Sequence, residues 1–349
     1  MNKIVVFGTN DQLKIIRKRL SVSYEVIGCY DLADDSTEKI CSINNVQDNI
    51  CIFADKKQKR KFNDIFGEIG VESVIYEDFV HTTYTTPIDN IQNHEFTGLI
   101  MGMSHAQCAI DVSIISKYKY LNVAAPSMDL YLQRGFLLLM LDRYPNLIQN
   151  IKSIILELPY YIFNYDLSKF GQFTLTKFKY YEMINDYHHY TDKVKIKEYR
   201  LFISIFNKME NDGLKIEQPS ITKDIKRILK YPVRLLRIAK EKFNVWDNYY
   251  SETNKENIEI FQNIINIIHS RIPQAQLKIL VMPFNPVFRW SHKSSICARK
   301  KDFYNSLEDG IEIVDEFDYF NQCNLFDDHC HLNKKGGRIY SKHLNDIIK

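Results

Sequence analysis

Hydrophobic and polar positions alternate in blocks that predict strands followed by helices over the first 80 residues. The apolar run KIVVFGTN (3–10) ends in Gly and Asn, and the next stretch, DQLKIIRKRL (11–20), places Leu13, Ile16 and Leu20 on one helical face. Further strands are predicted at 23–31, 49–54 and 72–77, with a helix at 56–70. This β-α-β alternation indicates a small parallel sheet.

A second series of strands and helices begins at TGLIMGMS (97–104). It continues with predicted strands at 120–125, 151–159, 277–286 and 311–317, and with predicted helices at 127–144, 254–272 and 333–348. The polar stretch 81–96 contains a proline and is the best linker candidate, whereas 165–245 is tyrosine-rich and charged. We therefore predict an α/β protein with a small Rossmann-like domain at 1–88 and a larger domain at 95–349, which carries an insertion at 165–245.

Composition narrows the class of protein. With 45% hydrophobic and 26% charged residues, the chain has the make-up of a soluble globular protein, and a net charge of +3 is too small to indicate nucleic-acid binding. No run of about 18 apolar residues predicts a transmembrane helix, and the first apolar run is too brief for a signal peptide, so we expect a cytoplasmic protein. Seven cysteines without a Cys-x-x-Cys pair argue against a zinc ribbon or a disulfide framework.

The first candidate for chemistry is Ser104, which follows the apolar strand 99–101 and a glycine. Functional groups gather at the carboxyl ends of parallel strands, and the N–H groups of a helix's first turn favour an anion. Ser104 is thus placed where a serine nucleophile would be, with its own N–H able to help hold an oxyanion. The alternative is that this serine only caps the helix.

The second candidate is the stretch FDDHCHLNKKGG (326–337), which leads into the last predicted helix. Asp328 and His331 are three residues apart, so the carboxylate can bond one imidazole nitrogen and leave the other to accept a proton from a serine. His329 is then expected to point away, toward solvent or the insertion. There are two alternatives: a plain polar loop, and a zinc site that uses His329, His331 and an aspartate. The two histidines lie on one side only in an extended backbone and no remote third ligand is obvious, so we expect no metal.

These two motifs together resemble the SGNH/GDSL hydrolase superfamily over about residues 97–349. GLIMGMSHAQCAID (98–111) is similar to its first conserved block, although Met103 stands where the family usually has aspartate, and FDDHCHLNKKGG is similar to its last. The resemblance implies a three-layer α/β/α domain around a parallel sheet. It also implies that Ser104 is the nucleophile, His331 the general base and Asp328 the residue that orients it.

The same resemblance suggests where an oxyanion hole would form. The family's second block corresponds to LNVAAPS (121–127), where Ala124 or Ala125 stands near the glycine whose N–H is a donor. The third block normally supplies an asparagine, and Asn164 is the nearest one after the predicted strand at 151–159. We therefore expect Ser104, Ala124, Ala125 and Asn164 to line the oxyanion and substrate-binding side.

Two other segments bear on ligands. The N-terminal part resembles the small Rossmann-like domains that precede bacterial sugar-modifying acyltransferases, but only Gly8 remains of a dinucleotide-binding glycine motif, so no NAD or other cofactor is expected. Two roles stay open for this domain: binding of a nucleotide sugar or glycan, and a structural or oligomerisation role.

Residues 223–242 hold eight Lys or Arg interleaved with Ile and Leu around Pro232. They suit an anionic membrane surface, an acidic glycan or a solvated helical face.

The expected function follows from the resemblance, not from composition. It is acyl transfer or ester hydrolysis through an acylated Ser104, on a bacterial surface polysaccharide or its precursor, by a cytoplasmic protein. Peripheral contact of residues 223–242 with the inner face of the membrane is left open. The expected partners are a glycan or an activated sugar or acyl donor. The alternatives are transfer of another group in capsule or glycan biosynthesis, and a catalytically degenerate module that binds glycan or scaffolds an assembly complex. The oligomeric state is left open.

Overall fold

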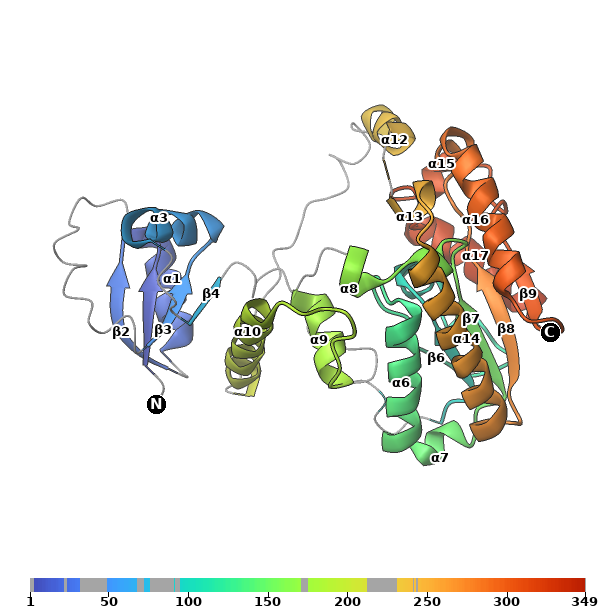
Figure 1. The fold of residues 1–349 in the computed structure, drawn as a ribbon, viewed down its shortest axis with the longest axis horizontal. Helices are drawn as coiled ribbons and strands as arrows, with labels where there is room; N and C mark the ends of the chain where they lie inside the picture. Colours follow the sequence, from blue (N-terminus) through green and yellow to red (C-terminus); the bar gives the residue numbers. More distant parts are fainter. Residues whose placement is uncertain are drawn as a thin grey trace. The chain divides into compact units, whose positions relative to one another are not determined.

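The computed structural model describes residues 3–21, 24–31, 49–67, 72–75, 91, 95–170, 175–211, 231–240, 242 and 244–348 (Figure 1). The chain divides into two compact units: the first comprises residues 1–84, 174–179 and 191–221, and the second comprises 85–173, 180–190 and 222–349. Both contain an all-parallel sheet, in agreement with the predicted α/β class. Among the described residues, no helix combines the length and the apolar composition needed to cross a bilayer.

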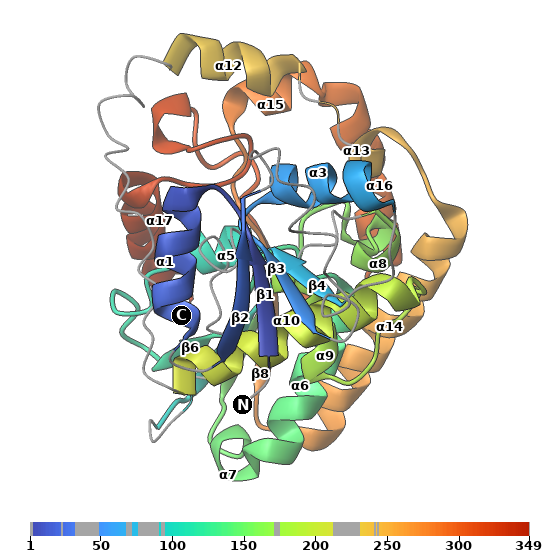
Figure 2. The same cartoon turned by 90° about the vertical axis from the view of Figure 1, so that its left-hand side faces the viewer.

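The first unit is built on a four-stranded sheet with the order β2-β1-β3-β4. Its elements are β1 (Lys3–Phe7), α1 (Asn10–Leu20), β2 (Glu25–Tyr30), β3 (Ile50–Phe53), α3 (Lys56–Phe66), β4 (Ser73–Ile75) and α10 (Lys193–Asn211). Alternate residues of β1 face opposite ways: Ile4 and Val6 pack with the apolar face of α1, and Val5 and Phe7 pack with Phe62 of α3. Helices therefore cover both faces of the sheet, as a parallel sheet requires (Figure 2).

Helix α10 corrects the predicted domain boundaries. It falls within the predicted insertion of the larger domain, yet it packs beside β4 of the first unit, and its Ile205 is buried with Ile4 and Val74. The sheet has apolar side chains on both faces, and each face must be covered by a helix. The covering helix need not be close in sequence to the strands it packs on. Helix α9 (Leu175–Met183) contributes residues 175–179 to the first unit and its remainder to the second.

The second unit is built on a five-stranded sheet with the order β6-β5-β7-β8-β9. Its strands are β5 (Gly98–Met101), β6 (Tyr120–Asn122), β7 (Ser153–Glu157), β8 (Gln276–Val281) and β9 (Glu312–Asp315). Its helices are α5 (Ser104–Ala109), α6 (Leu130–Arg143), α7 (Pro145–Ile148), η2 (Ile162–Asn164), α8 (Leu167–Phe170), α12 (Tyr231–Lys240), α13 (Asn244–Asp247), α14 (Ser251–Arg271), α15 (Pro286–Ser291), α16 (Lys293–Ser306), η3 (Cys323–Leu325) and α17 (Lys334–Ile347).

Helices cover both faces of this sheet, which makes three layers. Helices α6 and α14 lie side by side on one face (Figure 1), where Phe136 and Ile264 are buried against strand residues such as Ile154. Helices α5 and α17 cover the other face, where Tyr340 packs with Ile155. Three layers around a parallel sheet were predicted for this part of the chain.

Two predicted segments lie largely or partly outside the described residues. Most of the linker candidate at 81–96 belongs to them, and so do residues 223–230, 241 and 243 of the basic stretch. The described part of that stretch forms α12, in which Pro232 is the second residue. A proline is tolerated in the first turn, because the N–H it lacks has no partner within the helix there. The proposed contact with a membrane or acidic glycan stays a prediction.

Candidate active site

Ser104 is the first residue of α5 and follows β5 through a two-residue turn. Gly102 has φ 151°, a conformation that side chains rarely adopt, and a Cβ there would lie 2.6 Å from Cβ of Glu157. Met103 is extended and precedes the helix as its N-cap residue. In a sheet of this strand order, the carboxyl ends of β5 and β7 flank the point where the order reverses, which is where ligands usually bind. The turn thus places Ser104 at the expected end of the sheet.

Asp328 and His331 lie in a tight loop between η3 and α17. The loop is closed by a bridge between Phe326 and Leu332 and by a hydrogen bond from Asp327 N–H to the carbonyl of His331. Asp328 Oδ1 accepts hydrogen bonds from the N–H of Cys330 at 2.9 Å and of His331 at 2.7 Å. An aspartate that bonds the backbone two and three residues ahead is typical of a turn, and here it also aims the carboxylate at its own histidine.

Three side chains form a continuous hydrogen-bonded chain. Oγ of Ser104 lies 2.7 Å from Nε2 of His331, and Nδ1 of the same ring lies 2.7 Å from Oδ2 of Asp328. The two ends are 227 positions apart in sequence. The prediction that Ser104 and His331 come within hydrogen-bonding distance is confirmed, and the geometry is that of a nucleophile, a base and a group that orients the base.

The surroundings keep Asp328 ionised. Burial alone would favour the neutral carboxyl, but hydrogen bonds from the His331 ring and from two backbone N–H groups outweigh it and hold the pKa of Asp328 well below its usual value. A carboxylate at Nδ1 fixes that nitrogen as the protonated one. Nε2 is then the acceptor that faces the Ser104 hydroxyl.

A buried pair, His105 and Glu157, lies directly behind the serine and was missed by the sequence analysis. Glu157 ends β7, next to β5, and is fully buried; Oε2 accepts the N–H of Met103 at 2.7 Å, and Oε1 lies 3.0 Å from Nδ1 of His105. The His105 ring lies 5.4 Å from the His331 ring. A glutamate at the carboxyl end of a buried strand was the available signal, since such positions converge at the same edge as Ser104.

His329 differs from the expectation that it points to solvent or to the insertion at 165–245. Its ring lies 5.3 Å from that of Phe288 in α15, and burial lowers the pKa of His329 to about 4. Asn285, the N-cap of α15, fastens this part of the loop by donating hydrogen bonds to the carbonyls of His329 and Asp328. The apolar ring of Phe288 gives the imidazole a packing partner, which the local spacing of the motif did not reveal.

The predicted oxyanion donors are engaged elsewhere. The N–H of Ala124 is donated to Asn122 Oδ1, and that of Ala125 to the carbonyl of Gly102, each at 3.1 Å. Asn164 donates its amide hydrogens to the carbonyls of residues 245 and 248, and its Oδ1 accepts the N–H of Tyr250. It therefore holds the segment before α14 in place, and the prediction that it serves the oxyanion hole is wrong.

Three groups of side chains place possible metal donors within 4.8 Å of one another in the described residues. Two belong to this site and share the buried Cys330: one with His105 and His331, the other with Asp328 and His329. In the first, both nitrogens of His331 already have partners in the serine and the aspartate. The third group lies elsewhere in the second unit and is taken up below. The expected absence of a catalytic metal stays a prediction.

No protein-family model matches the chain, and neither does any curated protein. The function proposed below therefore depends on the geometry of the described residues and on the motif resemblance.

Proposed function

We propose that the second unit is a serine-dependent acyl-transfer enzyme, an esterase or acyltransferase. The observation that carries this proposal is the hydrogen-bonded chain from Ser104 through His331 to Asp328. A serine hydroxyl is a weak nucleophile, and this arrangement is the one that activates it. Position supports it too, because the serine begins a helix at the carboxyl edge of a parallel sheet.

The reaction has two stages, acylation and deacylation of Ser104. As Oγ of Ser104 attacks the ester carbonyl, Nε2 of His331 takes its proton, and Asp328 stabilises the imidazolium through Nδ1–H. Collapse of the tetrahedral intermediate breaks the bond to the leaving alcohol, which receives that proton and departs, leaving acyl-Ser104. Water or an acceptor hydroxyl then loses a proton to His331, attacks the acyl carbon and releases Oγ, which regains the proton.

Ser104 itself supplies the oxyanion donor in this proposal. Its N–H belongs to the first turn of α5, where backbone N–H groups have no partner within the helix. The neighbouring N–H of Met103 is held by Glu157 and therefore sets the turn instead of binding substrate. An oxyanion hole with one backbone donor stabilises the transition state less than one with two donors. In a serine protease, loss of one such donor costs about 2.7–4 kcal/mol.

The proposed substrate is an O-acylated surface polysaccharide or its activated precursor, as the motif resemblance implies. One feature suits a charged precursor: a cavity of about 500 Å³ beside the start of α16, whose lining includes Lys240, Lys242 and His292 together with the carboxylate of Asp247. The His292 ring stacks on Phe288, which also contacts His329 next to Asp328. Because the two lysines outnumber the one carboxylate, this lining favours a phosphate-bearing donor.

The second candidate function is a non-catalytic glycan-binding module of the same fold. It is favoured by one observation: the N–H groups of Ala124 and Ala125 and the amide of Asn164 are all used within the protein. A site that cannot hold an oxyanion would bind its ligand without turning it over.

Labelling with a fluorophosphonate separates the two candidates, because the probe reacts only with an activated serine. We expect the full chain to be labelled once, and Ser104→Ala and His331→Ala to abolish the labelling. Ser113→Ala, a change on an exposed turn nearby, is the matched control and should label normally. Labelling that survives Ser104→Ala contradicts the enzyme proposal, and a wild-type chain that takes no label favours the binding module.

A further inference from the structure

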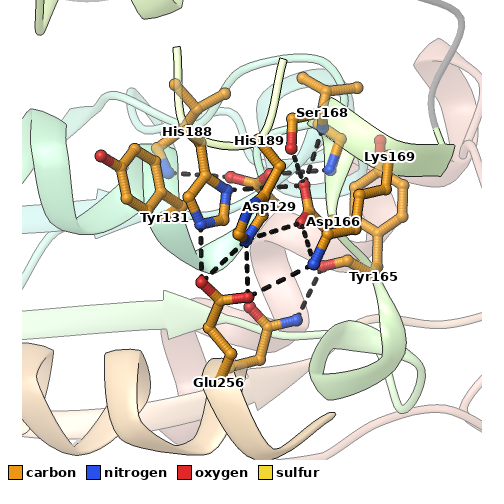
Figure 3. Close-up of polar contacts among 12 residues, drawn as sticks. Asp129, Tyr131, Tyr165, Asp166, Ser168, Lys169, His188, His189 and Glu256 are labelled. Carbon is orange, nitrogen blue, oxygen red and sulfur yellow. Dashed lines mark hydrogen bonds and ion pairs between the residues drawn. The ribbon is translucent and has the colours of Figure 1, made fainter. Parts of the chain in front are cut away.

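A second cluster of chemically capable side chains lies in the second unit, built from segments that the triad does not use. It consists of Asp166, which follows η2; His188 and His189, in the turn after α9; and Glu256 of α14 (Figure 3). Two imidazoles and two carboxylates each offer one donor atom, and these atoms lie within 4.8 Å of one another.

Glu256 is the common neighbour of both histidines. Its Oε1 lies 3.0 Å from Nε2 of His188, and its Oε2 lies 2.9 Å from Nε2 of His189. Asp166 approaches from the opposite side in Figure 3, with Oδ2 at 3.9 Å from Nε2 of His189 and Oδ1 at 3.6 Å from Nδ1 of His188. The four side chains thus surround one point.

The fold holds His188 rigidly toward this point. Its backbone has φ 54°, which a histidine adopts only occasionally, and its N–H is donated to Asp186. The ring stacks on Tyr131 at 3.8 Å between centroids, and only 8% of its side chain is exposed. Ligands that are locked before a metal arrives lose little conformational freedom on binding it.

Asp166 is the most deeply buried of the four side chains. It is 1% exposed, its Oδ1 is occupied by the hydroxyl and N–H of Ser168, and its Oδ2 is paired with the ammonium group of Lys169, at 3.3 Å. A buried carboxylate needs a cation close by, because removing its charge from water is costly. The Oδ2 atom faces the histidine pair (Figure 3).

We propose that Asp166, His188, His189 and Glu256 bind a zinc ion. Two imidazole nitrogens and two carboxylate oxygens are donors that zinc accepts, and four protein ligands make a closed, structural site with no position left for substrate. The metal joins three segments that are distant in sequence: the link between η2 and α8, the turn that ends the 180–190 segment of the second unit, and α14.

Lys169 is the competitor for the same carboxylates. Its Nζ lies 3.3 Å from Oδ2 of Asp166 and 3.5 Å from Oε2 of Glu256. The lysine is partly exposed and sits on a long side chain, so zinc displaces it into solvent without moving the backbone. Asp129, also drawn in Figure 3, is no ligand, because it caps α6 and accepts the N–H of Leu167.

The test is a titration of the full chain, freed of any histidine tag and stripped with a chelator, with zinc chloride in competition with a chromophoric chelator. We expect one zinc ion per chain at this site. Loss of a ligand in His189→Ala or Glu256→Gln should weaken its affinity at least about tenfold, since even outer-shell changes cost 10–100-fold. Lys169→Met, which removes the competing cation, should bind zinc more tightly.

Matched controls separate this site from the cysteine-containing groups beside the triad. His269→Ala removes an exposed histidine from the same helix as Glu256, and Cys330→Ser removes the thiol that both other groups share. Both should leave the affinity unchanged, and cobalt in place of zinc should show no thiolate charge-transfer band. A wild-type chain that binds no zinc, binding that His189→Ala leaves intact, binding that Cys330→Ser abolishes, or weaker binding by Lys169→Met overturns the proposal.

Discussion

The two sheets of this protein share a strand order but differ at the end of their first strand. In sequence order within each unit, both run 2-1-3-4, and the second sheet adds a fifth strand. In both, the first strand passes through a glycine into a helix: FGTN leads into α1 and MGMS into α5. Topology therefore brings a helix start to the same place in each unit, and the side chains that follow the glycine decide what happens there.

In the first unit, local hydrogen bonds occupy this place. Gln12 accepts the N–H of Thr9 at 2.9 Å and donates to Asp55, which follows the neighbouring strand β3, at 2.8 Å. Asp31, after β2, accepts the N–H of Asn10. A Cβ on Gly8 would meet Ala54 at 2.9 Å, so the two turns are closely packed.

In the second unit, the corresponding place holds Ser104, and a residue from the far end of the chain reaches it. Glu157, at the end of the neighbouring strand β7, accepts a backbone N–H of the turn directly, whereas Asp55 in the first unit reaches its turn through the side chain of Gln12. The hydroxyl is thereby left facing His331. The two units thus share a topology that places a helix start at the end of the first strand. Only in the second unit do a serine and a distant histidine make this place a candidate active site.

The largest expected effect tests the assignment of chemistry to the second sheet. His331→Ala should lower kcat for ester hydrolysis by several orders of magnitude, as removal of a triad base does. His329→Ala should change kcat less than about tenfold, or about 1.4 kcal/mol. Equal, severe losses in both variants, together with loss of wild-type activity in a chelator, would replace the serine mechanism with metal chemistry.

The next effect concerns Glu157, the buried support of the nucleophile's turn. Glu157→Gln keeps the shape but cannot accept from both Met103 N–H and a protonated Nδ1 of His105. We expect kcat to fall about 10- to 100-fold, or about 1.4–2.7 kcal/mol, with little change in KM. Glu316→Gln, which alters a carboxylate–histidine pair away from the serine, is the control and should leave kcat unchanged. A rise in KM alone would show that Glu157 acts on substrate binding.

The stability of the second unit should depend on pH through the half-buried ring of His329. The pKa of His329 is lowered to about 4 from an ordinary value of 6.5, so between these values the unfolded chain binds the proton more readily than the folded one. The free energy of unfolding should therefore fall as pH drops from 6.5 to 4, by at most about 3 kcal/mol from this group. Urea unfolding of wild type and His329→Asn at pH 7 and pH 4.5 measures it; equal pH dependence in both would contradict the burial of this ring.

The smallest effect probes the first sheet. Gln12→Ala removes two hydrogen bonds at the turn after β1, and we expect the first unit to lose about 1 kcal/mol of stability. Ester turnover should not change, because Gln12 belongs to the unit without the serine. Thermal unfolding and the esterase assay are the two measurements, with Gln149→Ala, in the second unit, as the matched substitution. A loss of turnover in Gln12→Ala but not in Gln149→Ala would contradict the assignment of ester turnover to the second unit.

Local pattern was sufficient for much of this protein. Alternation of apolar runs and helical spacing predicted two parallel α/β sheets, because strand and helix periods depend on near neighbours in sequence. The glycine before Ser104 and the three-residue offset of Asp328 and His331 also depend on short stretches. Their positions at the carboxyl ends of strands were enough to predict that they meet across 227 residues.

Tertiary structure alone decided the remaining features, because each depends on which partner a buried group finds. Asn164 has the right chemistry for an oxyanion donor, but its amide is used by backbone carbonyls of the segment before α14. Helix α10 belongs by sequence to the insertion, yet its apolar face is buried on the first sheet. Glu157 and the Asp166–His188–His189–Glu256 cluster join strands, turns and helices far apart in the chain. Spacing along a sequence specifies local conformation, whereas hydrogen bonding and burial between distant segments are settled only when the chain packs.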